Sequence, residues 1–283
     1  MAWTTRFAPS PTGFLHLGHL YSALQVWKQG QLCLLRIEDI DHGRCKTLYE
    51  VQIIEDLRWL GFEWHGPVLR QSERMGLYVQ ALEQLHNQGL LYPCFCTRKE
   101  MRAQALSAPH GQILRYNGRC KGLSTAVISD RIAQGMAHTW RLNMDQACAL
   151  YPHLTWQELD FKGKVHHRPC EAHLWGDVVI ARKDIPASYH LAVCVDDDAQ
   201  GVTLVTRGVD LYHATSVQRL LQALLGLASP CYAFHPLLLD AQGKRFAKRD
   251  KAKTLKAFRA EGYSPGDLKK LAMIYPNLCW NKS

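Results

Sequence analysis

The sequence lacks any uninterrupted apolar run near the ~18–20 residues that a helix needs to cross a bilayer. Its first residues, MAWTTRFAPSPTG, also lack the apolar core of a secretory signal peptide. We find no internal repeat and no long linker. These absences argue against a membrane-spanning, secreted or repeat protein, so we expect a cytoplasmic protein with no membrane partner.

Cysteine is plentiful, yet a disulfide framework is not expected. The ten cysteines lie in a long chain without an export signal, where reduced thiols or metal ligands are favoured over disulfides. With 283 residues, of which 47% are hydrophobic and 21% charged, the chain has the composition of a globular protein rather than a disordered one. Its length allows one large α/β domain or two smaller ones.

Positive charge is concentrated at the end of the sequence. The formal net charge is +9, and residues 244–283 alone hold 11 basic and 3 acidic residues. So dense a run of like charge repels itself unless it is solvated or faces a polyanion. We therefore expect nucleic acid or nucleotide phosphate as a partner, with a solvated basic tail as the alternative.

Strand and helix patterns alternate in the first 65 residues, which predicts parallel βαβ units. We expect strands at 4–8 and 31–37 and helices at 18–28 and 48–60. After a less regular stretch, a second α/β half is expected, with strands at 177–181, 189–195, 202–206 and 235–239, and helices at 214–225 and 265–274.

Four segments follow from this pattern. The predicted division is a first α/β half at 1–91, an insertion at 92–174, a second α/β half at 175–255, and a basic helical stub at 256–283.

The first predicted turn from strand to helix carries a phosphate-binding pattern. His16 and His19 flank Gly18 near a helix N-terminus, where free N–H groups attract phosphate oxygens. The glycine leaves room for a base or a phosphate chain beside the backbone. The alternative is that His16 and His19 are two ordinary surface histidines.

The string RFAPSPTG at 6–13, followed by HLGH at 16–19, resembles the opening of the class I glutamyl-tRNA synthetases. Further matches occur in the family's order, at LRIED (35–39), DVVIAR (177–182), SYHLA (188–192), VDD (195–197) and RGVDL (207–211). The resemblance spans residues 4 to 255. It implies a Rossmann-type doubly wound parallel sheet that binds ATP with Mg²⁺.

The family also has a mobile lysine loop, and QGKRFAKR at 242–249 lies at its position. The resemblance assigns catalytic roles to His16, His19 and Lys248. It assigns the same three residues, together with Gly18 and Arg245, to the ATP site. Lys248 would stabilise charge on the pyrophosphate as the α-phosphorus is attacked. Here Arg245 replaces the first lysine of the loop and Ala247 its serine, so a non-catalytic paralogue is the alternative.

A glutamate pocket needs an anion for the ammonium group, an arginine fork and several hydrogen-bond donors. The resemblance assigns Arg6 and Arg207 to the carboxylates, Ser10 and Tyr189 as hydroxyl donors, and Glu38 to the α-ammonium group. Solvated surface positions are the alternative for the charged residues.

Three thiols and a phenol lie within the predicted insertion. Cys94, Cys96, Tyr116 and Cys120 have the spacing of a closed structural zinc site. Three cysteines leave one tetrahedral position for water or Tyr116, and some members of the glutamyl-type family bind zinc through CxC, Tyr and Cys. Buried or spare thiols are the alternative.

Only about 30 residues follow the lysine loop, whereas full-length members of the family carry an anticodon-binding domain there. The family has a branch with only a catalytic core, which activates glutamate without tRNA and transfers it to queuosine in the anticodon loop of tRNA(Asp). We expect that activity in a monomer. The alternatives are a minimal synthetase that charges a tRNA 3′ end, a nucleotidyltransferase that shares only the histidine turn, and a non-enzymatic tRNA-binding paralogue.

Overall fold

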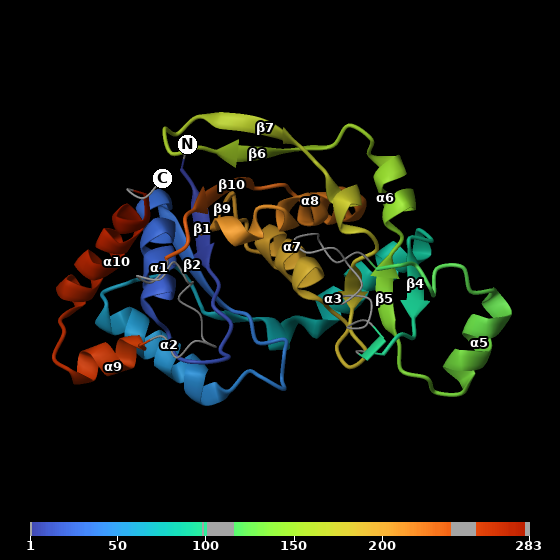
Figure 1. Ribbon diagram of the computed structural model, residues 1–283, viewed down its shortest axis with the longest axis horizontal. Coiled ribbons are helices and arrows are strands. Elements are labelled where there is room, and N and C mark those ends of the chain that lie inside the picture. Colours follow the sequence, from blue (N-terminus) through green and yellow to red (C-terminus); the bar gives the residue numbers. More distant parts are fainter. Residues whose placement is uncertain (1, 98, 101–115, 239–252, 281–283) are drawn as a thin grey trace.

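The computed structural model describes residues 2–97, 99–100, 116–238 and 253–280. The first half of the chain alternates strands and helices as predicted (Figure 1). Its elements are β1 (Thr4–Phe7), α1 (Leu17–Gln29), β2 (Leu32–Ile37), α2 (Thr47–Trp59), β3 (Leu69–Arg70), the 3₁₀ helix η1 (Gln71–Arg74) and α3 (Met75–Asn87). The strands form a parallel sheet in the order β1-β2-β3.

The rest of the described chain adds seven strands and further helices. In order they are β4 (Leu91–Cys94), α5 (Thr125–Ala133), β5 (Thr139–Leu142), α6 (Met144–Leu150), β6 (Thr155–Leu159), β7 (Val165–Pro169), η2 (Ala172–Trp175), β8 (Val179–Ala181), α7 (Tyr189–Ala199), β9 (Leu204–Gly208), η3 (Val209–Leu211), α8 (Ala214–Leu225), β10 (Cys231–His235), α9 (Leu255–Ala260) and α10 (Pro265–Trp280). The predicted helices at 214–225 and 265–274 are confirmed.

A second sheet continues the first. Its order is β7-β6-β10-β9, in which β10 runs parallel to both β6 and β9. The start of β1 lies beside the segment before β9, where the Thr203 amide donates to the Thr4 carbonyl at 2.9 Å. The parallel α/β architecture is therefore confirmed, and the carboxyl ends of β1, β2, β9 and β10 converge on one site.

Strand pairing crosses the limits that were predicted at 91/92 and 174/175. In a separate antiparallel sheet, β5 lies between β4 and β8, which joins residues from before, within and after the predicted insertion. Strand β6 of the same segment pairs with β10 of the main sheet. The hairpin of β6 and β7 follows the edge of that sheet in Figure 1.

Two of the predicted strands need correction. Residues 189–195 form the first part of helix α7. Seven consecutive residues of this helix, from Leu191 to Asp197, are buried. The helix therefore has no exposed polar side in this stretch, and its run of apolar residues resembles the sequence pattern of a buried strand. The strand predicted at 235–239 is β10, which begins and ends four residues earlier at Cys231 and His235; residue 239 is outside the described residues.

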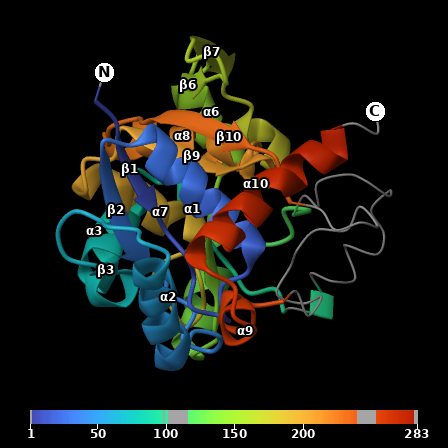
Figure 2. The same cartoon turned by 90° about the vertical axis from the view of Figure 1, so that its left-hand side faces the viewer.

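The last two helices cover the N-terminal half of the molecule. Helix α10 lies against α1 (Figure 2), where Leu268 and Ala272 are buried in the same core as Leu20 and Ile37. A second core gathers around α3, α7 and α8. The C-terminal segment therefore completes the hydrophobic core beside the first strand and helix.

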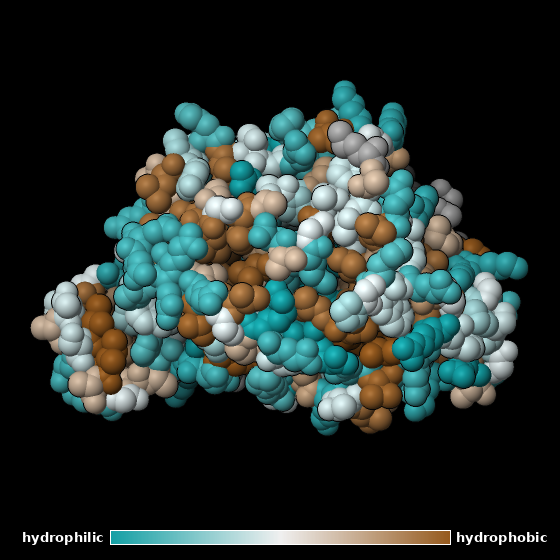
Figure 3. All heavy atoms as spheres, turned by 180° about the vertical axis from the view of Figure 1, so that it is seen from behind, coloured by the Kyte–Doolittle hydropathy of each residue, from teal (hydrophilic) through white to brown (hydrophobic). Residues whose placement is uncertain are grey.

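Seen from behind, the surface mixes hydrophilic and apolar residues, and brown apolar atoms lie across its middle as well as at the end that holds α5 (Figure 3). Val127 and Ile132 of this helix are 38% and 43% exposed. Among the described residues, no helix combines the length and hydropathy needed to cross a membrane.

Candidate active site

A cavity of about 650 Å³ opens where the carboxyl ends of the parallel strands converge. Ligands of open α/β sheets bind at this edge. The cavity brings together all eight of the described residues that the sequence assigned to ATP or glutamate, namely Arg6, Ser10, His16, Gly18, His19, Glu38, Tyr189 and Arg207. Their individual roles stay predictions.

The histidine turn begins helix α1. The Nδ1 atom of His16 accepts a hydrogen bond from the Gly18 amide at 3.1 Å, and Nδ1 of His19 accepts one from the His16 amide at 3.2 Å. The two imidazole rings lie against each other, with their centroids 3.8 Å apart. The motif is therefore a reciprocal N-terminal cap that fixes both rings at the cavity wall.

Four charges alternate in sign behind the cavity, and two of them, Arg6 and Glu38, line it. One carboxylate oxygen of Asp197 accepts hydrogen bonds from Arg6 Nε at 2.9 Å and from Arg36 Nη1 at 2.7 Å. Nη2 of Arg36 donates to Glu38 at 3.2 Å. Arg6 is 5% exposed and Arg36 is fully buried, so each of these ions depends on its neighbours for compensation.

The pKa values in this wall follow from burial and pairing. Burial would raise the pKa of Asp197, but the guanidinium groups of Arg6 and Arg36 hold it below its usual range. Burial raises the pKa of Glu38, and the opposing effect of Arg36 does not cancel that rise. Asp197 is therefore the firmly ionised member that positions both arginines.

The two arginines that were assigned to glutamate carboxylates differ in how they are held. Arg6 is bound through Nε, and neither of its Nη atoms has a hydrogen-bond partner among the described residues. Arg207 donates through Nη1 to Gln218 at 2.7 Å and through Nη2 to Thr215 at 2.6 Å. Arg6 thus presents its fork to the cavity, whereas Arg207 is locked to helix α8.

Sequence reasoning missed the positioning residues of this site. Arg36 and Asp197 were quoted within motifs but given no role, and Gln218 and Thr215 were not singled out. An arginine inside the apolar strand β2 is the signal that could have been used, because a fully buried guanidinium requires a carboxylate partner.

Two of the predicted ATP-site residues, Arg245 and Lys248, lie outside the described residues. The described chain resumes beside the histidine turn. There Thr254 forms a bridge with His16, and the Leu255 amide donates to the Leu15 carbonyl at 2.8 Å.

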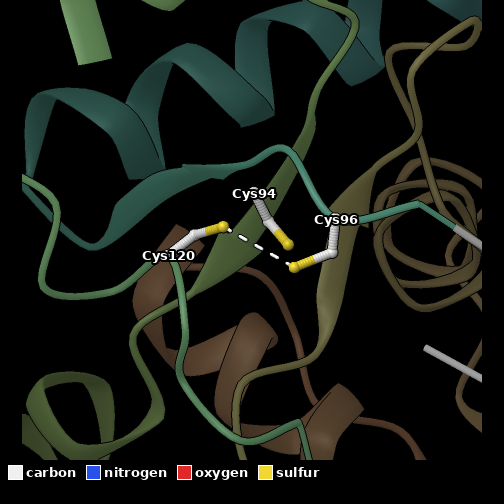
Figure 4. A group of neighbouring side chains, drawn as sticks. All are labelled: Cys94, Cys96 and Cys120. Atoms are coloured by element: carbon white, nitrogen blue, oxygen red, sulfur yellow. Dashed lines mark hydrogen bonds between the residues drawn. The ribbon is translucent and has the colours of Figure 1, made fainter. Parts of the chain in front are cut away.

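The cysteines predicted to bind zinc form a compact group. The three Sγ atoms of Cys94, Cys96 and Cys120 all lie within 4.8 Å of one another. Figure 4 shows them pointing toward a common centre, with Cys96 and Cys120 Sγ 3.7 Å apart. The Tyr116 hydroxyl is 3.4 Å from Cys94 Sγ and 3.5 Å from Cys96 Sγ.

These separations fit one tetrahedral ion. Zinc bonds of about 2.3 Å to sulfur and about 2.0 Å to oxygen place two sulfurs about 3.8 Å apart, and a sulfur and an oxygen about 3.5 Å apart. Despite burial, the hydrogen bonds that Cys94 shares with Tyr116 and Arg141 lower the pKa of its thiol to about 7. The Arg141 guanidinium lies 3.8 Å from the centre of the Tyr116 ring. The group could therefore hold a metal ion.

A nucleotide-sized cavity at the strand ends, with a histidine turn at its wall, is the arrangement of a class I synthetase core. Residues 2–273 match the family model for the catalytic domain of class I tRNA synthetases (E and Q). The chain belongs to this family and is an ATP-dependent ligase by class.

Three relatives show which members of this family the chain is similar to. The chain is similar to the glutamyl-Q tRNA(Asp) synthetase of Rhodobacter capsulatus, with 45% identity over 94% of this chain and 98% of the relative. It is 42% identical to the protein of the same name in Nocardia farcinica, over 96% of this chain and 84% of the relative. Glutamate–tRNA ligase 2 of Acidithiobacillus ferrooxidans is 38% identical over 92% of this chain, which spans 55% of that relative.

A solved structure gives the same fold. The glutamate tRNA ligase of Elizabethkingia meningosepticum, determined in complex with its amino acid, superposes with a TM-score of 0.72 at 25% identity. The match covers 94% of this chain and 59% of that one.

Proposed function

We propose that the chain activates glutamate with ATP in the absence of tRNA and transfers it to queuosine in the anticodon loop of tRNA(Asp). The observation that carries the first step is the Arg6 fork, held by Asp197 in a cavity that also presents Glu38 and the histidine turn. The names of the relatives from Rhodobacter and Nocardia support the second step.

Activation joins two anions, so the site must orient glutamate and compensate charge. Arg6 binds a glutamate carboxylate through its Nη atoms, and Glu38 accepts from the α-ammonium group. His16 and His19 donate to ATP phosphates at the N-terminus of α1. An oxygen of the α-carboxylate attacks the α-phosphorus, pyrophosphate leaves, and glutamyl-adenylate remains. Mg²⁺ bound to ATP would supply further charge compensation.

Transfer then uses the adenylate as an acyl donor. A hydroxyl oxygen of the queuosine cyclopentenediol bonds to the glutamyl carbonyl carbon, the bond from that carbon to the phosphate oxygen breaks so that AMP leaves, and the hydroxyl proton passes to water. A protein can bind a base of a single-stranded loop after the base has been extruded from the stack. An anticodon base can therefore reach a cavity at the strand ends. The basic last 40 residues favour contacts with RNA phosphates.

Glutamate-dependent ATP–pyrophosphate exchange without tRNA tests the first step. We expect exchange with glutamate and far less with glutamine or aspartate, because glutamine leaves an arginine fork unpaired at a cost of ~1–3 kcal/mol. Exchange that requires added tRNA would instead favour an ordinary synthetase that charges a 3′ end.

Transfer of labelled glutamate tests the second step. The acceptors to compare are tRNA(Asp) with queuosine, the same tRNA with guanosine at that position, and tRNA(Glu). A fourth acceptor, queuosine-containing tRNA(Asp) without its terminal adenosine, separates the two attachment sites. Labelling of the first and fourth alone is expected; labelling lost with the terminal adenosine would refute transfer to queuosine.

We also propose that Cys94, Cys96, Tyr116 and Cys120 hold one structural zinc ion. Burial raises the pKa of the Tyr116 phenol, so a bound cation has to promote its ionisation. The Cys120 amide donates to the Tyr116 oxygen at 2.8 Å and Arg141 lies over its ring, and both stabilise a phenolate. The ion would tie strand β4 to the segment around Cys120.

Zinc content tests this site. We expect about one zinc per chain, and Cys96→Ser should lower both zinc content and stability because binding a structural metal is coupled to folding. Cys148→Ser is the matched control, since Cys148 is a half-buried thiol outside the group. Protein from zinc-replete cells that contains no zinc would contradict the proposal.

A further inference from the structure

Helix α1 turns one side toward the active-site cavity. Gly18, His19, Ser22 and Val26 line that cavity, and their spacing of three or four residues places them on one face of the helix. Ser22 is half-buried and lies one turn beyond the histidine motif. Because the backbone groups of a helix interior are paired with each other, Ser22 contacts a ligand in the cavity through its hydroxyl group.

The hydroxyl proton of Ser22 is directed by His235, the last residue of β10. Nδ1 of His235 is 2.9 Å from the Pro236 carbonyl oxygen, and Nε2 is 3.1 Å from Ser22 Oγ. A carbonyl oxygen only accepts, so Nδ1 carries the proton of the neutral imidazole and Nε2 is left as an acceptor. Ser22 must therefore donate its proton to Nε2.

The surroundings of His235 hold the ring in this state. Burial lowers the pKa of His235 by more than the Pro236 carbonyl and the Asp210 carboxylate raise it, so the ring is uncharged at neutral pH. His235 is 6% exposed. The Tyr21 ring packs edge to face against it, with centroids 5.2 Å apart. The orientation of the imidazole is therefore set before a ligand binds.

Ser22 consequently presents one polarity to the cavity. Its proton points to His235, and among the described residues its hydroxyl has no second partner. The oxygen therefore offers only lone pairs to a ligand. It favours a ligand group that donates an N–H or O–H bond, and it disfavours a group that only accepts.

The position of Ser22 fits the nucleoside part of ATP rather than its phosphates. Ser22 follows Gly18 by four residues, which is about 6 Å along the helix axis. Phosphates that bind the free amides at the start of the helix leave the attached ribose and base at about this distance. The Asp210 carboxylate also lines the cavity and acts on His235, so this end of the cavity disfavours an anion.

We propose that Ser22 is a specificity residue that accepts a hydrogen bond from the nucleoside of ATP, and that His235 positions the Ser22 proton. Outside its triphosphate, ATP has three donors, namely the 6-amino group of adenine and the 2′- and 3′-hydroxyls of ribose. The inference rests on the ATP-dependent activation proposed above and assigns the recognition of the nucleoside to this end of α1.

Equilibrium binding of ATP and three analogues tests the contact. The analogues are purine riboside triphosphate, 2′-deoxy-ATP and 3′-deoxy-ATP, each of which lacks one donor, and calorimetry measures their Kd with Mg²⁺ and without glutamate. Ser22→Ala should weaken the binding of ATP and of two analogues about 3–10-fold, and it should leave the Kd of the third unchanged. That third analogue identifies the group that Ser22 contacts.

Equal weakening of all four nucleotides, or of none, would overturn the proposal. Ser129→Ala is the matched control, because Ser129 also lies on a helix, α5, but does not line the cavity. All four Kd values should be the same in this variant as in the unmodified protein.

Long-range ¹H–¹⁵N spectra test the role of His235, because the chemical shift of a ring nitrogen shows whether that nitrogen carries a proton. The resonances are assigned by their loss in His235→Gln. We expect a protonated Nδ1 and a bare Nε2 at neutral pH. A protonated Nε2 would overturn the positioning role, since the Ser22 proton would then be free to point to a ligand.

Pyrophosphate exchange separates this inference from the proposed function. In Ser22→Ala the KM for ATP should rise about 3–10-fold while kcat changes little, which is the pattern of an interaction lost equally from the ground state and the transition state. An unchanged KM for ATP would refute the contact and leave glutamate activation in place. The expected pattern of nucleotide binding in a protein without exchange would refute glutamate activation alone.

Discussion

Arg6→Met should lower kcat/KM for glutamate-dependent pyrophosphate exchange about 100-fold or more. Both Nη atoms of Arg6 have no partner among the described residues, so they can donate two charge-assisted hydrogen bonds to a carboxylate. Each such bond contributes ~1.5–3 kcal/mol. Arg6→Lys keeps the charge but loses the planar fork, and it should recover only part of the activity.

Arg44→Met is the matched control for this loss. Arg44 has the same side chain and also pairs with an aspartate, but its side chain is 66% exposed and it does not line the cavity. Exchange should change little in that variant. Because Arg6 also pairs with buried Asp197, circular dichroism must first show that each Arg6 variant is folded at the assay temperature. Near-normal kcat/KM in a folded Arg6→Met protein would refute the assignment of Arg6 to the carboxylate.

Asp197→Asn should lower the free energy of unfolding by about 3–5 kcal/mol, because it leaves two buried guanidinium groups without their shared anion. Urea denaturation measures the change. Asp145→Asn removes a carboxylate whose side chain is 86% exposed and paired with Lys121, and it should change stability by less than about 0.5 kcal/mol. Equal free energies of unfolding for the two variants would show that other groups compensate the charges of Arg6 and Arg36.

The contribution of Asp197 should also depend on pH in a defined direction. Its pKa is lower in the folded protein than its ordinary value of 3.8. The contribution of Asp197 to the free energy of unfolding is therefore fully present above its ordinary pKa, and it is lost as the pH falls through the pKa of the folded state. The stability difference between the unmodified protein and Asp197→Asn should accordingly shrink below pH 3.8.

The family resemblance named the residues of the site, and their places at the ends of short, regular elements explain why the fold brings them together. The turn after β1 combines Pro9, Pro11 and Gly13 with the histidine motif, and local chemistry alone places that motif at the start of a helix. Parallel strands bring their carboxyl ends to one edge, so Arg6, Glu38 and Arg207 meet there although they are far apart in the chain.

The sequence by itself thus determined the α/β alternation and the histidine turn, since each depends on local spacing. The tertiary structure brought Cys94 and Cys96 together with Tyr116 and Cys120, which follow about 20 residues later in the chain. Only the tertiary structure decided that residues 189–195 form a helix, because burial of Leu191 to Asp197 removes the exposed polar face that helical periodicity needs. It also decided the partners of two adjacent aspartates on that helix. Asp197 accepts from Arg6 and Arg36, whereas Asp196 accepts from Gln71, Arg74 and Tyr78. Successive residues of a helix point in different directions, about 100° apart, so which buried charge compensates which depends on how the helix packs.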